Sequence, residues 1–125
     1  MERMKTIEQA AAESTCLKRV VVCEIYDGQG ELLARESNRC NPPDGKCCRM
    51  GAVSVQSGYP EASDCMWTHA EEMAILSLPD RSSPTRATVY GHSFPCPPCE
   101  RKLRAAGVKD IYVARHEATG LRTPE

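Results

Sequence analysis

The chain has 125 residues, a formal net charge of −1, and a hydrophobic fraction of 41%. This length suits one domain that buries roughly two-thirds of its unfolded surface, so we expect a single domain over residues 1–125. The near-neutral charge argues against a protein that holds nucleic acid through a strong positive field, and no apolar run approaches the ~20 residues of a membrane helix.

The cysteine count points to a reducing compartment. Eight cysteines could staple a small secreted scaffold. The chain is longer than such scaffolds, and its first residues, Met1 to Lys5, lack the apolar core of a signal peptide. We therefore expect a cytoplasmic protein with reduced thiols that are available to a metal.

The first third of the chain has the pattern of a helix followed by a β-hairpin. Thr6 is a suitable helix cap, and apolar residues then recur at helical spacing. An apolar run, a Gly-rich turn and a second run follow, as in a hairpin. These elements are expected at residues 6–17 (helix), 20–26 (strand), 27–30 (turn) and 31–36 (strand). Residues 38–67 are rich in Pro, Gly, Cys and Ser, and such a long loop indicates a functional segment.

The second half alternates helix and strand. A helix should open at His69 and end before Pro79, and another should open at Cys96 and stop at Gly107. Strands are expected at residues 87–91 and 110–114. A hairpin followed by α-β-α-β predicts a three-layer α/β/α fold, with a mixed sheet of four to five strands that is parallel in its second half.

Two short motifs carry the chemistry. They are His-Ala-Glu at residues 69–71 and Pro-Cys-Pro-Pro-Cys at residues 95–99. His69, Cys96 and Cys99 would supply three metal ligands and leave a fourth position open to water, which is the layout of catalytic zinc. The positive ends of two helices would favour thiolates at such a site. The alternative is an ordinary histidine beside a structural cysteine pair.

Glu71 is the expected proton carrier. It lies two residues from His69, and side chains two apart point to different sides of a helix. Glu71 therefore suits a role beside the metal better than a role as a ligand. In that position it could move protons between water and a reacting ring.

With these motifs in place, the chain resembles the zinc-dependent cytidine and deoxycytidylate deaminase superfamily, and within it most closely the deoxycytidylate (dCMP) deaminases. Further matching segments are residues 14–16, Asn38, Cys65 and residues 106–109. The resemblance implies hydrolytic deamination, most readily of dCMP to dUMP and ammonia, with Glu71 as the catalytic residue. It also implies that a substrate-binding set contacts the sugar and base: Asn38, Ala70, Ser93 and Phe94. Asn38 could instead simply make a turn.

Other features of the chain bear on this resemblance. Some dCMP deaminases hold a second, structural zinc, and the candidate ligands here are Cys40, Cys47, Cys48 and Cys65. These cysteines could equally be buried thiols that pack as small apolar groups.

The C-terminal segment differs from the family pattern. Family members usually have more chain after the fourth strand, and the segment after Ala114 is short and polar. Either the last element of the fold is reduced, or a neighbouring subunit covers the sheet edge, and we expect a homo-oligomer.

Three classes of function stay open. The first is an enzyme acting on a small cytosine nucleotide, nucleoside or base. The second is an editing deaminase acting on single-stranded DNA or tRNA, which the acidic pI and few aromatic residues disfavour. The third is a non-enzymatic zinc module, in which Glu71 would have no purpose.

A substrate that carries a phosphate group would need a cation in the protein to bind it. The candidates are Arg19, Arg39, Lys46, Arg49 and Arg115.

Overall fold

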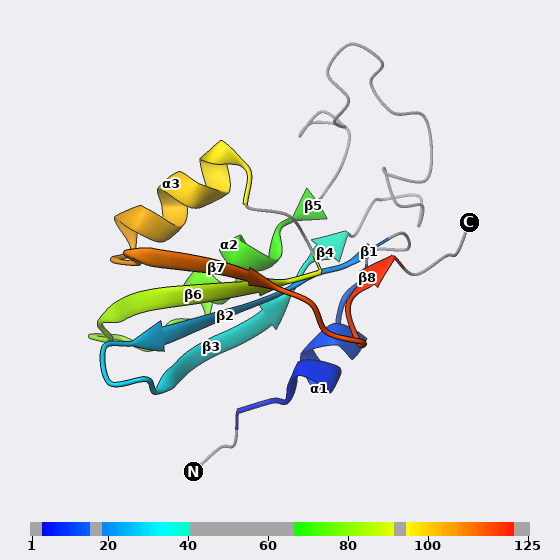
Figure 1. The fold of residues 1–125 in the computed structure, drawn as a ribbon, viewed down its shortest axis with the longest axis horizontal. Coiled ribbons are helices and arrows are strands. Elements are labelled where there is room, and N and C mark those ends of the chain that lie inside the picture. The colour runs from blue at the N-terminus through cyan, green and yellow to red at the C-terminus, as the bar shows by residue number, and fades with distance from the viewer. Residues whose placement is uncertain (1–3, 16–18, 41–66, 92–94, 122–125) are drawn as a thin grey trace.

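The computed structural model describes residues 4–15, 19–40, 67–91 and 95–121. Its centre is a mixed four-stranded sheet in the order β3-β2-β6-β7 (Figure 1). β2 pairs antiparallel with both β3 and β6, whereas β6 and β7 are parallel. The strands of this sheet are β2 (Val22–Asp27), β3 (Leu32–Ser37), β6 (Pro84–Tyr90) and β7 (Asp110–Ala114).

Helices cover both faces of the sheet, and the predicted three-layer α/β fold is confirmed. Cys23 and Ile25 of β2 point to one face, where they join a buried cluster with α2 (Ala70–Leu76) and α3 (Pro97–Ala105). Because side chains alternate along a strand, Val22 points to the other face and packs against α1 (Ile7–Ala12). We call these the α2/α3 face and the α1 face.

Two short ribbons flank the sheet. β1 (Arg19–Val20) pairs antiparallel with β8 (Gly120–Leu121), and β4 (Arg39–Cys40) pairs antiparallel with β5 (Trp67–Thr68). The second ribbon brackets residues 41–66, which lie outside the described part of the chain. The strand β5 of this ribbon ends at Thr68, just before α2 begins at Ala70.

The first helix is shorter than predicted. Thr6 caps it, accepting a hydrogen bond from the backbone N–H of Gln9, but the helix ends at Ala12 rather than at residue 17. Two residues further on, the Ser14 hydroxyl donates to Asn38 at 2.8 Å. This long-range bond ties the chain to the sheet in place of another helical turn.

The first predicted strand is also interrupted. Residues 20–26 were expected as one strand, but β1 and β2 are separated at Val21. The Val21 backbone bonds instead to Asn38: its N–H donates to Asn38 Oδ1, and its carbonyl accepts from the Asn38 backbone N–H. The hairpin itself is confirmed, with the turn closed by a bond from Gly30 N–H to the Asp27 carbonyl.

The segment after β7 contains β8, which the sequence pattern did not predict. Gly91, at the end of β6, lies directly beneath it with φ of 80°. A Cβ at this position would come within 2.7 Å of both the Thr119 Cβ and the Val20 carbonyl oxygen. Only glycine fits there, since the backbone is in the left-handed region and the neighbours are in contact.

Within the described residues, no helix is both long and apolar enough to cross a membrane.

Candidate metal centre

The start of α2 presents the first candidate ligand. His69 is the N-cap residue, with extended backbone, and the helix then runs through good helix formers to Leu76. Glu71 and Glu72 lie in the first turn, where the helix dipole favours negative charge. The prediction that a helix opens at His69 is therefore confirmed.

The start of α3 presents the other two. Cys96 is the N-cap, Pro97 and Pro98 occupy the first two helical positions, and Cys99 follows. Proline is tolerated there because those N–H groups have no helical partner in any case. At its other end the helix stops before Gly107, whose φ of 114° suits glycine.

The fold brings the three predicted ligands together. One ligand atom from each of His69, Cys96 and Cys99 lies within 4.8 Å of the others. A tetrahedral zinc ion with bonds of about 2.0–2.3 Å needs its ligand atoms about 3.5–3.8 Å apart, so side-chain shifts of up to about 1 Å would complete the site. Nitrogen with sulfur is the donor set that zinc prefers. The arrangement can hold a metal.

Glu71 lies beside this cluster. Its residue is 1% exposed, and its Oε2 atom is buried without a hydrogen-bond partner among the described residues. Burial raises the pKa of this carboxyl, and the neighbouring Glu72 charge raises it further. An orphaned buried oxygen beside three metal-binding atoms is the feature expected where a water or substrate group must be met.

Electrostatics at the cluster favour a cation. Burial raises the pKa of the Cys99 thiol, and the negative charges of Glu71 and Cys96 raise it further. Cys23, beneath them in the core, is fully buried and its pKa is raised well above the ordinary value, first by burial and then by Glu71. A bound dication would supply the counter-charge that these acidic groups lack and would keep the ligand thiols deprotonated.

The predicted substrate residues fall in different places. Ala70 is buried at the first position of α2, next to His69. Asn38 is 4% exposed, and its side-chain oxygen accepts from Ser14 and from Val21 N–H while its amide nitrogen donates to the Arg19 carbonyl. Ser93 and Phe94 lie outside the described residues. In the structure Asn38 joins three segments, and its contact with a sugar stays a prediction.

The second metal site and the phosphate cation stay predictions as well. Cys47, Cys48 and Cys65 lie outside the described residues, as do Lys46 and Arg49, and the Cys40 side chain is not described. Arg39 is described, and its guanidinium pairs with Glu13 at 3.1 Å and Glu36 at 3.3 Å. Lys5 shares these two carboxylates, and the Arg39 Nε has no hydrogen-bond partner among the described residues, so phosphate binding by Arg39 stays a prediction.

One polar pair beside the cluster was not singled out from the sequence. The Glu72 carboxylate accepts a hydrogen bond from the His69 backbone N–H at 3.0 Å and also pairs with Lys102 of α3. The available signal was position: Glu72 is the third residue of a helix, where a glutamate reaches back to the N-cap.

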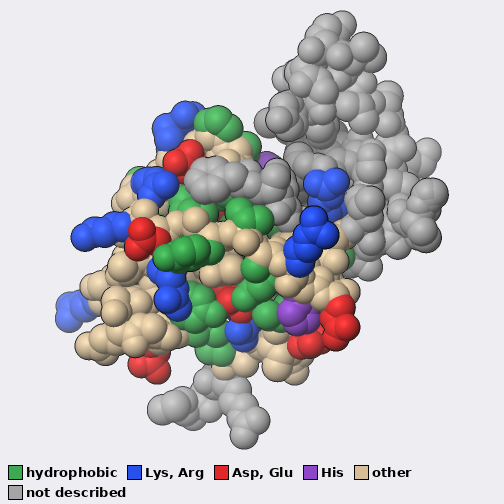
Figure 2. Space-filling view, viewed as in Figure 1, with side chains coloured by type: hydrophobic (Ala, Val, Ile, Leu, Met, Phe, Trp, Pro, Cys, Tyr) green, Lys and Arg blue, Asp and Glu red, His purple; other side chains and the backbone are tan. Residues whose placement is uncertain are grey.

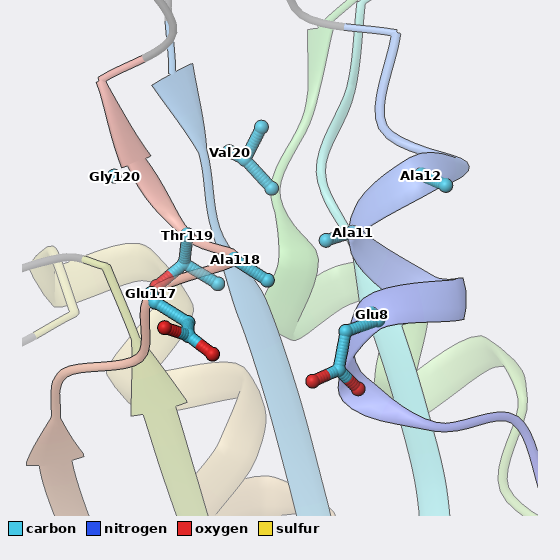
Figure 3. A pocket seen from close by; sticks show the side chains of 8 residues that line it. All are labelled: Glu8, Ala11, Ala12, Val20, Glu117, Ala118, Thr119 and Gly120. Carbon is cyan, nitrogen blue, oxygen red and sulfur yellow. The ribbon is translucent and has the colours of Figure 1, made fainter.

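A hollow of about 370 Å³ lies elsewhere, on the α1 face. Small apolar residues of α1 and of the segment before β8 line it, and the carboxylates of Glu8 and Glu117 face each other across it (Figure 3). Because the metal-binding atoms belong to the α2/α3 face, this hollow is not part of their site.

Comparison with known proteins agrees with the geometry. A model of the cytidine and deoxycytidylate deaminase zinc-binding region matches residues 1–115. The chain is 30% identical over 114 residues to deoxycytidylate deaminase of Schizosaccharomyces pombe, and 28% identical over 109 residues to deoxycytidylate deaminase of Saccharomyces cerevisiae. Each alignment covers 86% of this chain but only 34% and 35% of the two relatives, so the chain spans about a third of their length. With its motif residues gathered at two helix starts, the chain belongs to the cytidine and deoxycytidylate deaminase family.

Proposed function

We propose that this protein is a zinc-dependent hydrolase that deaminates a cytosine nucleotide, with dCMP as the preferred substrate. One observation carries the proposal: His69, Cys96 and Cys99 converge within 4.8 Å beside a buried Glu71 whose Oε2 has no partner. A structural zinc site is usually closed by four protein ligands and has no use for such a carboxylate.

The chain's residues have separable tasks in this reaction. Zinc, when bound, supplies a Lewis acid that makes water nucleophilic near neutral pH. Glu71 accepts a proton from that water, delivers a proton to N3 of the ring, and then serves the departing amine. One water is consumed at C4 and one ammonia is released, leaving a uracil ring. The raised pKa of Glu71 suits a group that must both take and give a proton.

A small substrate fits the surface better than a polynucleotide does. On the face drawn in Figure 2, Lys and Arg side chains are spread among acidic ones rather than gathered in one band. The whole chain carries 16 basic and 17 acidic residues. A protein that tracks a nucleic-acid backbone needs a positive stripe or groove.

The substrate is tested by the ratio of kcat/KM for dCMP and deoxycytidine, scored by ammonia release at low and high salt. We expect dCMP to be preferred, and high salt to weaken dCMP more than deoxycytidine, because only the phosphate is charged. Equal efficiencies would indicate a nucleoside deaminase. Activity confined to an oligonucleotide would indicate an editing enzyme acting on single-stranded DNA or tRNA.

Metal content is tested by elemental analysis. We expect at least one zinc per chain, and we expect Cys99→Ser to remove it, because loss of a thiolate leaves two ligands. A second equivalent that disappears on mutation of Cys40, Cys47, Cys48 or Cys65 would establish the structural site. A single equivalent in the unmutated chain as well as in these variants would refute it.

Assembly into a homo-oligomer remains part of the proposal. β7 is an edge strand of the sheet, and it exposes Tyr112 by 52% and Val113 by 42%. Exposed edge strands with apolar side chains are usually covered by another chain or segment. Light scattering should show a dimer or a larger closed assembly, and a fully active monomer would contradict this.

A further inference from the structure

The two helices that carry the candidate ligands are joined by one carboxylate. Glu72 Oε1 accepts from the backbone N–H of His69 at 3.0 Å, so it holds the residue that presents the imidazole. Glu72 Oε2 pairs with the Lys102 ammonium. Lys102 lies three residues after Cys99 on α3, which places the two side chains on one face of that helix.

We propose that Glu72 and Lys102 are positioning residues that set the distance between His69 on α2 and the two cysteines on α3, and thereby tune metal affinity. The proposal rests on the zinc centre of the proposed function but not on its substrate. Neither residue has a ligand atom in the cluster formed by His69, Cys96 and Cys99.

The connection joins parts of the chain that local structure does not couple. Glu72 and Lys102 are 30 residues apart, with β6 between them.

The solvent exposure of the Glu72–Lys102 pair indicates that it contributes little to folding stability. The side chains of Glu72 and Lys102 are 24% and 52% exposed, and exposed ion pairs add little to folding stability. Groups that orient metal ligands, in contrast, typically change metal affinity about 10- to 100-fold when removed. The pair should therefore matter for metal binding much more than for folding.

The chain offers a matched control. Arg104 pairs with Glu100 at 3.2 Å on the same helix, with side chains 43% and 36% exposed. That pair lies within α3 and does not reach α2. Arg104→Met therefore removes an ion pair of similar kind without touching the link between the helices.

The test is the zinc affinity of the full chain, measured by competition with a chromophoric chelator, together with the visible spectrum of the Co²⁺-loaded protein. We expect Lys102→Met to weaken zinc binding about tenfold and to alter the Co²⁺ bands. Lys102→Arg should restore both, whereas Arg104→Met should leave both unchanged. The thermal midpoint of the metal-free protein should be the same in the unmutated chain and in these three variants.

A double-mutant cycle closes the test. Glu72→Ala should weaken zinc binding at least as much as Lys102→Met, and the double variant should be no weaker than Glu72→Ala alone. Additive losses, unchanged affinity in Lys102→Met, or a loss matched by a lower midpoint of the metal-free protein would each overturn the proposal. The measured quantity is metal affinity, which does not depend on the substrate. A protein that binds zinc but does not deaminate dCMP would therefore refute the proposed function, and the role of Glu72 and Lys102 would still be tested.

Discussion

Two glutamates are each only 1% exposed, and they lie on opposite faces of the same sheet. On the α1 face, Glu24 is saturated: Tyr26 donates to it at 2.6 Å, Tyr90 at 3.0 Å, and Arg35 pairs with it at 2.6 Å. On the α2/α3 face, Glu71 keeps one oxygen without a partner among the described residues. A buried carboxylate that is fully bonded serves the fold, whereas one that is left incomplete is available for chemistry.

The largest expected effect is a loss of activity when Glu71, but not Glu24, is replaced. Glu71→Gln should lower kcat about 10²- to 10⁴-fold, because a positioned acid/base group typically contributes that much. Its free energy of unfolding should not fall, since an unpartnered buried carboxylate does not stabilise the fold. Steady-state ammonia release and urea unfolding measure the two quantities.

Glu24→Gln is the matched control for that variant, because it makes the same change at an equally buried site. It should retain the kcat of the unmutated protein. Near-normal turnover in Glu71→Gln, or an equal loss in both variants, would remove the distinction between the two faces.

The second prediction concerns stability on the α1 face. Glu24→Gln leaves the Arg35 guanidinium, whose side chain is 17% exposed, without its counter-charge. Breaking a buried ion pair by removing one partner costs roughly 3–5 kcal/mol, and partial exposure of Arg35 places the expectation near the lower end. Urea unfolding measures the loss, and an unchanged midpoint would show that the network is dispensable.

The smallest expected effect is a change in pH dependence. Burial, followed by the hydrogen bond to Glu24, raises the pKa of Tyr26 from 10.0 to about 12. The folded protein thus keeps a proton that the unfolded chain loses, so this contribution to stability is complete below pH 10 and is lost as pH rises toward 12.

Tyr26→Phe should therefore flatten the alkaline fall in unfolding free energy, measured by urea unfolding over that range. Tyr112→Phe, at a half-exposed position on the edge strand, is the control. An identical alkaline slope in Tyr26→Phe and the unmutated protein would show that Tyr26 is not held by Glu24 in solution.

Local chemistry made much of the fold and the candidate site predictable. The start of α3 follows from Pro97 and Pro98, which are tolerated only in a first turn, and its end follows from Gly107. His69, Cys96 and Cys99 could be chosen because they stand at the spacing of the His-x-Glu and Pro-Cys-x-x-Cys motifs. Each of these signals lies within a few residues of the element that it defines.

The features that were missed depend on partners distant in the chain. Asn38 reaches back 24 residues to Ser14, and this bond accompanies the early end of α1. Tyr90 reaches Glu24 across 66 residues, which no local pattern encodes. β8 is two residues long and exists through its pairing with β1, so periodicity had too few positions to detect it.

The glycine at position 91 has a consequence for how the sequence can change over time. Because Gly91 has no side chain, the Thr119 Cβ and the Val20 carbonyl oxygen can approach it closely, to 2.7 Å from where a Cβ would be. Any other residue at this position would have to displace the β1–β8 ribbon, because Gly91 directly follows β6 and is in contact with that ribbon. A side chain at position 91 should therefore be tolerated only together with changes in its neighbours there.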